Sequence, residues 1–150
     1  DIPTDAMKTY PIKGAYLLKP NLNELSMLAG KEELQEDEIA DVAKIIISRN
    51  VCEAVVVSMG PAGALLVTKD IAERFIAPTV KVKTTVGAGD SMVAGIVYTL
   101  ARGKSLKEAI RYGVACGTAA TMNPGTELCN KRDADALYSL VSLDVNYTKG

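Results

Sequence analysis

Apolar and polar residues follow two different periods along this chain, and the two periods predict alternating strands and helices. Short, largely apolar runs predict strands at residues 15–18, 54–58, 64–68 and 72–76. Apolar residues at helical spacing predict helices at residues 21–28, 36–49, 91–101, 105–122 and 132–141, with Asn50 as a stop after the second of them. Residues 81–85 are predicted to be extended. Apolar strands between helices indicate an α/β layered sheet.

Composition and charge narrow the classes of function. Of the 150 residues, 48% are apolar, which is enough for a substantial core. The 17 basic and 18 acidic residues nearly cancel, which argues against a nucleic-acid or membrane surface, so we expect neither partner. Because the chain has no histidine, a Ser-His triad and histidine-bound metals are excluded, and catalysis must use carboxylates, lysine, hydroxyls or backbone amides.

The cysteines predict the cellular compartment, and the first residues predict further sequence upstream of Asp1. Cys52, Cys116 and Cys129 are odd in number and lack CxxC spacing, so they predict neither a disulfide framework nor a zinc site. Scattered free thiols are typical of the reducing cytoplasm, which is the expected location. The chain begins at Asp1 without an initiating Met, and we expect further sequence upstream.

One short motif carries chemistry. Gly87, Ala88, Gly89 and Asp90 stand immediately before a predicted helix. Small side chains let backbone N–H groups converge on one point, and a helix N-terminus adds unpaired donors and partial positive charge, so the turn suits phosphate oxygens. Asp90, at the mouth of this anion hole, could accept a proton from a hydroxyl that attacks a phosphoryl group. The alternative interpretation is a tight turn in which Asp90 only caps the helix.

The sequence around this motif resembles a known family. TVGAGDSMVAG at residues 85–95 resembles the second signature of the PfkB carbohydrate kinases, which have a ribokinase-like fold. The resemblance extends through LKPN at 18–21, VVVSMG at 55–60, GTAAT at 117–121 and GT at 125–126, in the family's order and spacing. It implies a three-layer α/β/α sandwich, of which residues 1–150 form the C-terminal, nucleotide-binding part. The family's N-terminal half and lid would be absent.

The resemblance also implies an activity. It is greatest to the sugar-phosphate branch of the family, which implies ATP- and Mg²⁺-dependent phosphoryl transfer to a phosphorylated ketose. Fructose 6-phosphate, giving fructose 1,6-bisphosphate, is the preferred substrate; 1-phosphofructokinase or tagatose-6-phosphate kinase activity is the alternative. A nucleotide-binding module without catalysis is the alternative class. The full-length parent would be a homo-oligomer, and the isolated fragment would be inactive.

The family's functional positions can be carried over residue by residue. Asp90 would be the catalytic base, with Gly87, Ala88 and Gly89 as the anion hole. The ATP-binding positions would be Lys19, Asn21, Ser58, Gly60, Val114 and Thr118, with Glu24 near Mg²⁺. Each also has a purely structural interpretation: Asn21 and Glu24 form a capping box, Ser58 and Gly60 a strand-end turn, and Val114 and Thr118 a packed helix face.

The resemblance implies a monovalent cation site as well, with K⁺ as the candidate ion. Its positions are Thr84, Val86, Ala120, Asn123, Gly125 and Glu127, most of which would contribute backbone carbonyls. Thr84 departs from the residues that the family often has there, but it keeps the hydroxyl and the carbonyl. GKS at residues 103–105 lacks the first glycine of a P-loop and predicts a surface turn with Ser105 as a helix cap.

Overall fold

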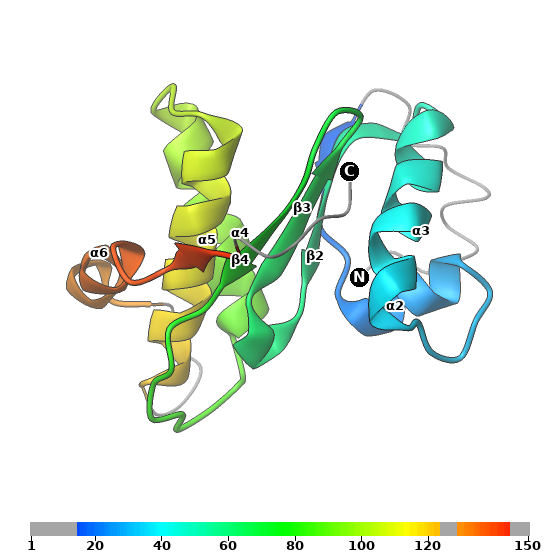
Figure 1. The fold of residues 1–150 in the computed structure, drawn as a ribbon. Helices are drawn as coiled ribbons and strands as arrows, with labels where there is room; N and C mark the ends of the chain where they lie inside the picture. Colours follow the sequence, from blue (N-terminus) through cyan, green and yellow to red (C-terminus); the bar gives the residue numbers. More distant parts are fainter. Residues whose placement is uncertain (1–14, 124–128, 145–150) are drawn as a thin grey trace. The chain divides into compact units, whose positions relative to one another are not determined.

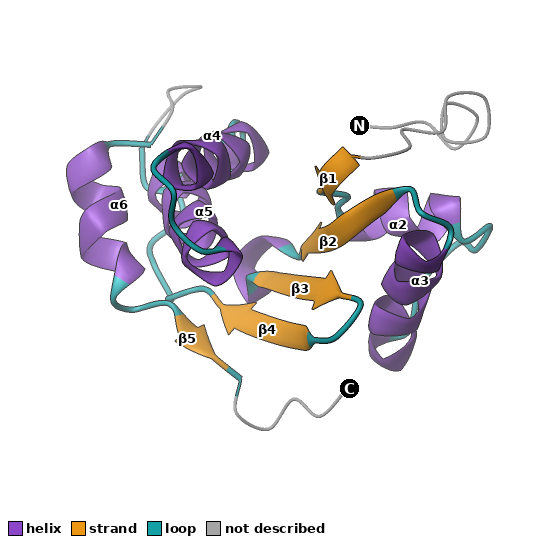
Figure 2. Cartoon of the chain, turned by 90° about the horizontal axis from the view of Figure 1, so that it is seen from above, coloured by secondary structure: helices purple, strands orange, loops and turns teal. Residues whose placement is uncertain are grey.

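The computed structural model describes residues 15–123 and 129–144, which belong to two compact units. The first unit contains the chain up to Met59 and again Leu65–Arg74, and the second contains Gly60–Ala64 and Phe75–Asp144. The strands β1 (Ala15–Leu18), β2 (Cys52–Ser58), β3 (Ala64–Thr68), β4 (Ala72–Ile76) and β5 (Ser142–Leu143) follow one another in sheet order (Figure 2). The sheet is mixed, because β1 pairs with β2 in parallel and β4 pairs with β5 antiparallel.

In the first unit, two helices pack against the parallel strands. Helices α2 (Leu22–Leu28) and α3 (Glu36–Ser48) lie beside β2 (Figure 1). The apolar stripe of α3, including Ile39 and Ile46, joins Val55 and Val57 of β2 in one buried cluster. Asn50 adopts a left-handed conformation with φ +59°, which confirms the predicted stop after α3.

In the second unit, α4 (Ala88–Ala101) and α5 (Leu106–Thr121) lie side by side, and α6 (Lys131–Tyr138) packs against α5 (Figure 2). Glycines bring the first two helices close together. A Cβ added to Gly95 would come within 2.7 Å of the Cys116 sulfur, and one added to Gly113 within 2.6 Å of Ile96. The α4–α5 spacing therefore depends on the absence of side chains at these positions.

The strands at 15–18, 64–68 and 72–76 are confirmed, whereas several predicted boundaries are wrong. β2 begins two residues earlier than predicted, at Cys52, and α4 begins at Ala88 instead of residue 91. Residues 81–85, which were predicted to be extended, lie outside the strands, and Lys83 and Thr84 donate their backbone N–H groups to the Thr121 carbonyl. The last helix ends at Tyr138, and the unpredicted β5 follows it.

The predicted cap at Ser105 is confirmed: its hydroxyl accepts the backbone N–H of Glu108, so the GKS segment is a helix–helix turn. Cys52 and Cys116 are buried free thiols, and Cys129 is a partly buried one. Within residues 15–123 and 129–144, every helix is too short or too polar to cross a membrane.

Candidate functional site

The turn before α4 has the geometry that its glycines predict. Gly87 is the N-cap of α4 and has φ +84°, a left-handed conformation that a side chain would strain. The Thr84 hydroxyl accepts the N–H of Val86 at 3.1 Å and holds the approach to the turn. One glycine and one threonine side chain therefore fix the backbone conformation of the turn itself.

The first turn of α4 presents backbone donors beside a carboxylate. The N–H of Ser91 bonds to the Gly87 carbonyl at 2.9 Å, but the N–H groups of Gly89 and Asp90 find no acceptor within the described part of the chain. Asp90 is exposed and lies in this same turn. Free amides at the positive end of a helix bind anions. Asp90 lies beside these amides, where its carboxylate can contact a hydroxyl group that attacks the bound anion.

Two contacts from α5 position this turn. The Thr121 carbonyl accepts the backbone N–H groups of Lys83 at 2.7 Å and of Thr84 at 3.2 Å. Gly117 lies so close to the Ala88 carbonyl that an added Cβ would be 3.2 Å from that oxygen. Helix α5 therefore contacts the chain both before the anion-binding turn, at Lys83 and Thr84, and within it, at Ala88.

A third contact comes from the segment before α6. The fully buried hydroxyl of Ser91 accepts the backbone N–H of Cys129 at 3.1 Å. Ser91, Gly117 and Thr121 therefore position the turn, and sequence reasoning assigned a role to none of them. The glycine of GTAAT was visible as part of the family resemblance, but nothing in the sequence indicates that residues 91 and 129 are partners.

A second group of predicted residues lies together in the first unit, at the carboxyl ends of β1 and β2. Asn21 forms an isolated parallel bridge with Ser58, and the Ser58 N–H bonds to the Pro20 carbonyl at 3.0 Å. The capping box is confirmed: the Glu24 carboxylate accepts the Asn21 N–H at 2.9 Å, and the Asn21 side chain accepts the Glu24 N–H at 2.8 Å. Carboxyl ends of parallel strands are where open α/β sheets bind ligands.

The remaining ATP-binding candidates occupy three local settings. Lys19 directly follows β1 and is partly buried. Gly60 starts the 3₁₀ turn Gly60–Ala62 with φ +56°, another conformation that favours glycine. On α5, Val114 is buried, and its carbonyl accepts the hydroxyl of the partly buried Thr118 at 2.8 Å, so the two residues lie on the same side of the helix.

The cation candidates are brought together in part. Thr84 is bonded to Thr121, the neighbour of Ala120, and the N–H of Asn123 bonds to the Ala120 carbonyl at 3.4 Å. Val86 is exposed two residues from Thr84. Gly125 and Glu127 lie outside the described residues.

Comparisons with known proteins place the chain in a family. The model of the pfkB family of carbohydrate kinases matches residues 3–133. ATP-dependent 6-phosphofructokinase isozyme 2 of Escherichia coli is 44% identical over 126 residues, which are 84% of this chain and 41% of that protein. The 1-phosphofructokinase of Borreliella burgdorferi is 31% identical over 134 residues, 89% of this chain and 43% of its own length.

Solved structures agree on the fold. The phosphofructokinase-2 of E. coli in complex with potassium superposes with a TM-score of 0.84 at 42% identity, covering 91% of this chain and 44% of that one. Ribokinase of Thermotoga maritima superposes with a TM-score of 0.73 at 25% identity, covering 82% and 42%. The fold is therefore ribokinase-like, as predicted, and this chain spans about two-fifths of the length of the relatives it matches.

Proposed function

We propose that this chain, which belongs to the pfkB family of carbohydrate kinases, is the C-terminal, nucleotide-binding and catalytic part of an ATP-dependent sugar-phosphate kinase. The observation that carries the proposal is the start of α4. There, a left-handed Gly87 and the free amides of Gly89 and Asp90 share one helical turn with an exposed carboxylate. The 44% identity to a 6-phosphofructokinase supports the same conclusion.

The amides act on the phosphoryl group that is transferred. In the proposed reaction, the predicted anion hole at Gly87, Ala88 and Gly89 binds the oxygens on which negative charge is spread. The free N–H groups of Gly89 and Asp90 are its main donors, because the Ala88 N–H donates to the Thr85 carbonyl at 3.4 Å. Because these donors are fixed by Gly87 and by the α5 contacts, they need no reorganisation as the charge develops. Water alone could not offer such preorganised donors.

Asp90 acts on the acceptor hydroxyl. Its exposed carboxylate orients the hydroxyl toward the γ-phosphate and takes its proton as the new O–P bond forms and the bond between the γ-phosphorus and ADP breaks. Because the carboxylate lies in the anion-binding turn, the hydroxyl that it activates is held beside the phosphoryl group that the amides bind. Positioning of this kind accounts for most of phosphoryl-transfer catalysis.

The predicted nucleotide-binding residues are described within each unit separately. Lys19, Asn21 and Ser58 at the carboxyl ends of β1 and β2 would contact the phosphates, together with Gly60. Val114 and Thr118 of α5 would form a wall of the adenine pocket.

Glu24 is the proposed magnesium-binding residue. In the described residues there is no cluster of three potential ligands of the His, Cys, Asp or Glu type, which agrees with an ion held mainly by phosphates and water. One Glu24 oxygen accepts the capping N–H of Asn21, and the carboxylate would face a metal-bound water. Magnesium would neutralise charge on the phosphates. The carbonyls around Thr84, Val86, Ala120 and Asn123 would hold K⁺, whereas Gly125 and Glu127 of the predicted site lie outside the described residues.

Fructose 6-phosphate is the proposed acceptor. The 6-phosphofructokinase relative is 44% identical, against 31% for the 1-phosphofructokinase, which favours the first activity over its alternative. Tagatose 6-phosphate is the other alternative. We propose further that the chain alone lacks the sugar-binding residues and is inactive, and that the full-length protein is a homo-oligomer.

A coupled ADP-release assay tests the proposal. The full-length protein that carries this chain should release ADP with fructose 6-phosphate faster than with fructose 1-phosphate or tagatose 6-phosphate, and not with buffer alone. A separate MgATP titration distinguishes the alternative class: saturable nucleotide binding with no turnover on any of the three sugars would show a non-catalytic nucleotide-binding module.

A further inference from the structure

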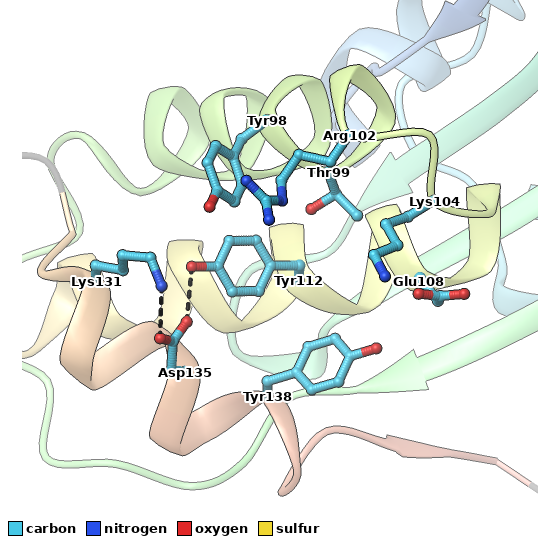
Figure 3. Close-up of a pocket in the computed structure, with 9 residues that line it drawn as sticks. All are labelled: Tyr98, Thr99, Arg102, Lys104, Glu108, Tyr112, Lys131, Asp135 and Tyr138. Carbon is cyan, nitrogen blue, oxygen red and sulfur yellow. Dashed lines mark hydrogen bonds and ion pairs between the residues drawn. The ribbon is translucent and has the colours of Figure 1, made fainter.

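An open pocket of about 280 Å³ lies in the second unit, where the C-terminal end of α4 meets α5 and α6. Figure 3 shows that each helix contributes one tyrosine: Tyr98 from α4, Tyr112 from α5 and Tyr138 from α6. None of the residues predicted for ATP, Mg²⁺ or K⁺ lines this pocket. Its chemistry is therefore not used by the proposed kinase reaction.

The three tyrosines form a row of aromatic rings. The ring centroids of Tyr98 and Tyr112 are 5.9 Å apart, and those of Tyr112 and Tyr138 are 6.0 Å apart, both within the range of favourable ring contacts. Tyr112 stands in the middle, and its ring is only partly buried. The planes of the two ring pairs are tilted by 33° and 55°, so the row offers separate aromatic faces, on one of which another ring can stack.

The acidic group at one side of this row is already neutralised. Asp135 pairs with Lys131 at 2.8 Å and accepts the hydroxyl of Tyr112 at 2.9 Å. These bonds, shown in Figure 3, fix the middle tyrosine in place. At this side the pocket therefore contributes shape and no net charge.

The other side carries an excess of positive charge. The Arg102 guanidinium lies 5.4 Å from the centroid of Tyr98, and Lys104 follows two residues later. Within the described residues, neither of these cations forms an ion pair with a carboxylate. Glu108 is the only acid among the lining residues on this side, and it accepts a hydrogen bond from Ser105. Two cations against one acid favour an anionic ligand.

We propose that this pocket binds a phosphate monoester that carries a flat ring. The ring stacks on the tyrosine row, and the phosphate, with close to two negative charges at neutral pH, bonds to Arg102 and Lys104. The volume of about 280 Å³ limits the ligand to about one or two rings and one phosphate.

The pocket is a site separate from the catalytic turn. Asp90 lies in the first turn of α4, whereas Arg102 caps its last turn, twelve residues later. At about 1.5 Å per residue, the two positions are roughly 18 Å apart along the helix axis. A ligand of one or two rings cannot contact both.

Phenyl phosphate is a suitable probe, because it combines the two features in the smallest form. Isothermal titration calorimetry measures the binding, because phenol has the same chromophore as the six tyrosines of this chain, of which only three belong to the row. We expect saturable binding of phenyl phosphate without Mg²⁺, at least tenfold tighter than that of inorganic phosphate or phenol. Equal binding of inorganic phosphate would reduce the pocket to a surface anion patch, and no saturation by any probe would overturn the proposal.

Matched variants locate the binding. Arg102→Gln and Arg132→Gln each remove one exposed positive charge, but only Arg102 lines the pocket. We expect Arg102→Gln to weaken phenyl phosphate binding about tenfold or more, Tyr98→Leu to weaken it several-fold, and Arg132→Gln to leave it within twofold. Circular dichroism spectra confirm that each variant is folded. Equal losses in the two arginine variants would show non-specific attraction and would contradict the site.

Discussion

The carbonyl oxygen of Ala88 occupies the space into which any side chain at Gly117 would have to project. A Cβ built on Gly117 would lie 3.2 Å from that oxygen, closer than ordinary van der Waals contact. Ala88 stands between Gly87 and Gly89 in the anion-binding turn, and Gly117 is part of α5. One missing side chain on a neighbouring helix therefore helps to define where the phosphate-binding amides point.

Replacing Gly117 by valine should impair catalysis more than folding. The larger side chain would displace the Ala88 carbonyl and turn the adjacent amides, each of which is worth roughly 10²–10³ in rate as an oxyanion donor. We expect kcat to fall at least tenfold in the full-length protein, with a much smaller effect on the free energy of unfolding. The exposed Ala136→Val on α6 is the matched control. Equal activity of the two variants would contradict the proposed contact.

Gly87 can be tested against a glycine of the same conformation. Gly87 and Gly103 have φ values of +84° and +76°, so valine should destabilise the protein at either position, by roughly 1–2 kcal/mol or more. Only Gly87→Val should also abolish most of the kinase activity, because Gly103 lies at the opposite end of α4. Unfolding midpoints and ADP release, measured on the same preparations, separate the two effects. Parallel loss of activity in both variants would favour the simple turn interpretation.

Local signals were sufficient to predict most of the elements. Apolar runs bounded by turn residues placed three strands correctly, and the capping side chains of Asn21 and Ser105 marked two helix starts. The anion turn was also predictable, because a glycine pair before an apolar helix is itself a local pattern. The exact start of α4 was not predictable, since Gly87 caps the helix through its backbone conformation and has no side chain that could indicate the cap.

Contacts between distant residues could not be predicted. The bond from Cys129 to the Ser91 hydroxyl and the bonds from Lys83 and Thr84 to the Thr121 carbonyl join residues about forty positions apart. The two-residue β5 is short and lacks a periodic pattern. Its pairing with β4 depends on the end of α6, where Arg111 donates hydrogen bonds to the Tyr138 and Val141 carbonyls and fixes the chain before the strand.

Asp90→Asn separates the catalytic role of this residue from a capping role. In the full-length protein the variant should lower kcat by about 10²–10⁴, as expected for a lost general base, while the KM for ATP changes little. Asp133→Asn is the control, because Asp133 also lies in the first turn of a helix, α6, but away from the anion turn. Steady-state kinetics of both variants decide the matter, and near-normal turnover by Asp90→Asn would remove Asp90 from the mechanism.

The cation site predicts a dependence on the monovalent ion. If the carbonyls around Thr84 and Asn123 hold K⁺, the ion also stabilises the segment that Thr121 anchors before the anion turn. Activity of the full-length protein should then rise when K⁺ replaces a large organic cation at constant ionic strength. An initial-rate series over K⁺ concentration measures this. A rate that does not change with the cation would reject the site.

Asp135 predicts a pH dependence of stability. The hydrogen bond from Lys131, and then that from Tyr112, lowers the pKa of Asp135 below its ordinary value of 3.8. A carboxylate whose pKa is lower in the folded state stabilises that state above the ordinary pKa and loses this contribution as the pH falls through the folded-state pKa. The stability difference between wild type and Asp135→Asn should therefore be present near pH 6 and shrink toward about pH 3. Urea unfolding at the two pH values measures it, and added salt should reduce the difference at the higher pH, because the pair is exposed. A difference that is the same at both pH values would show that the charge of Asp135 does not stabilise the contact between α5 and α6.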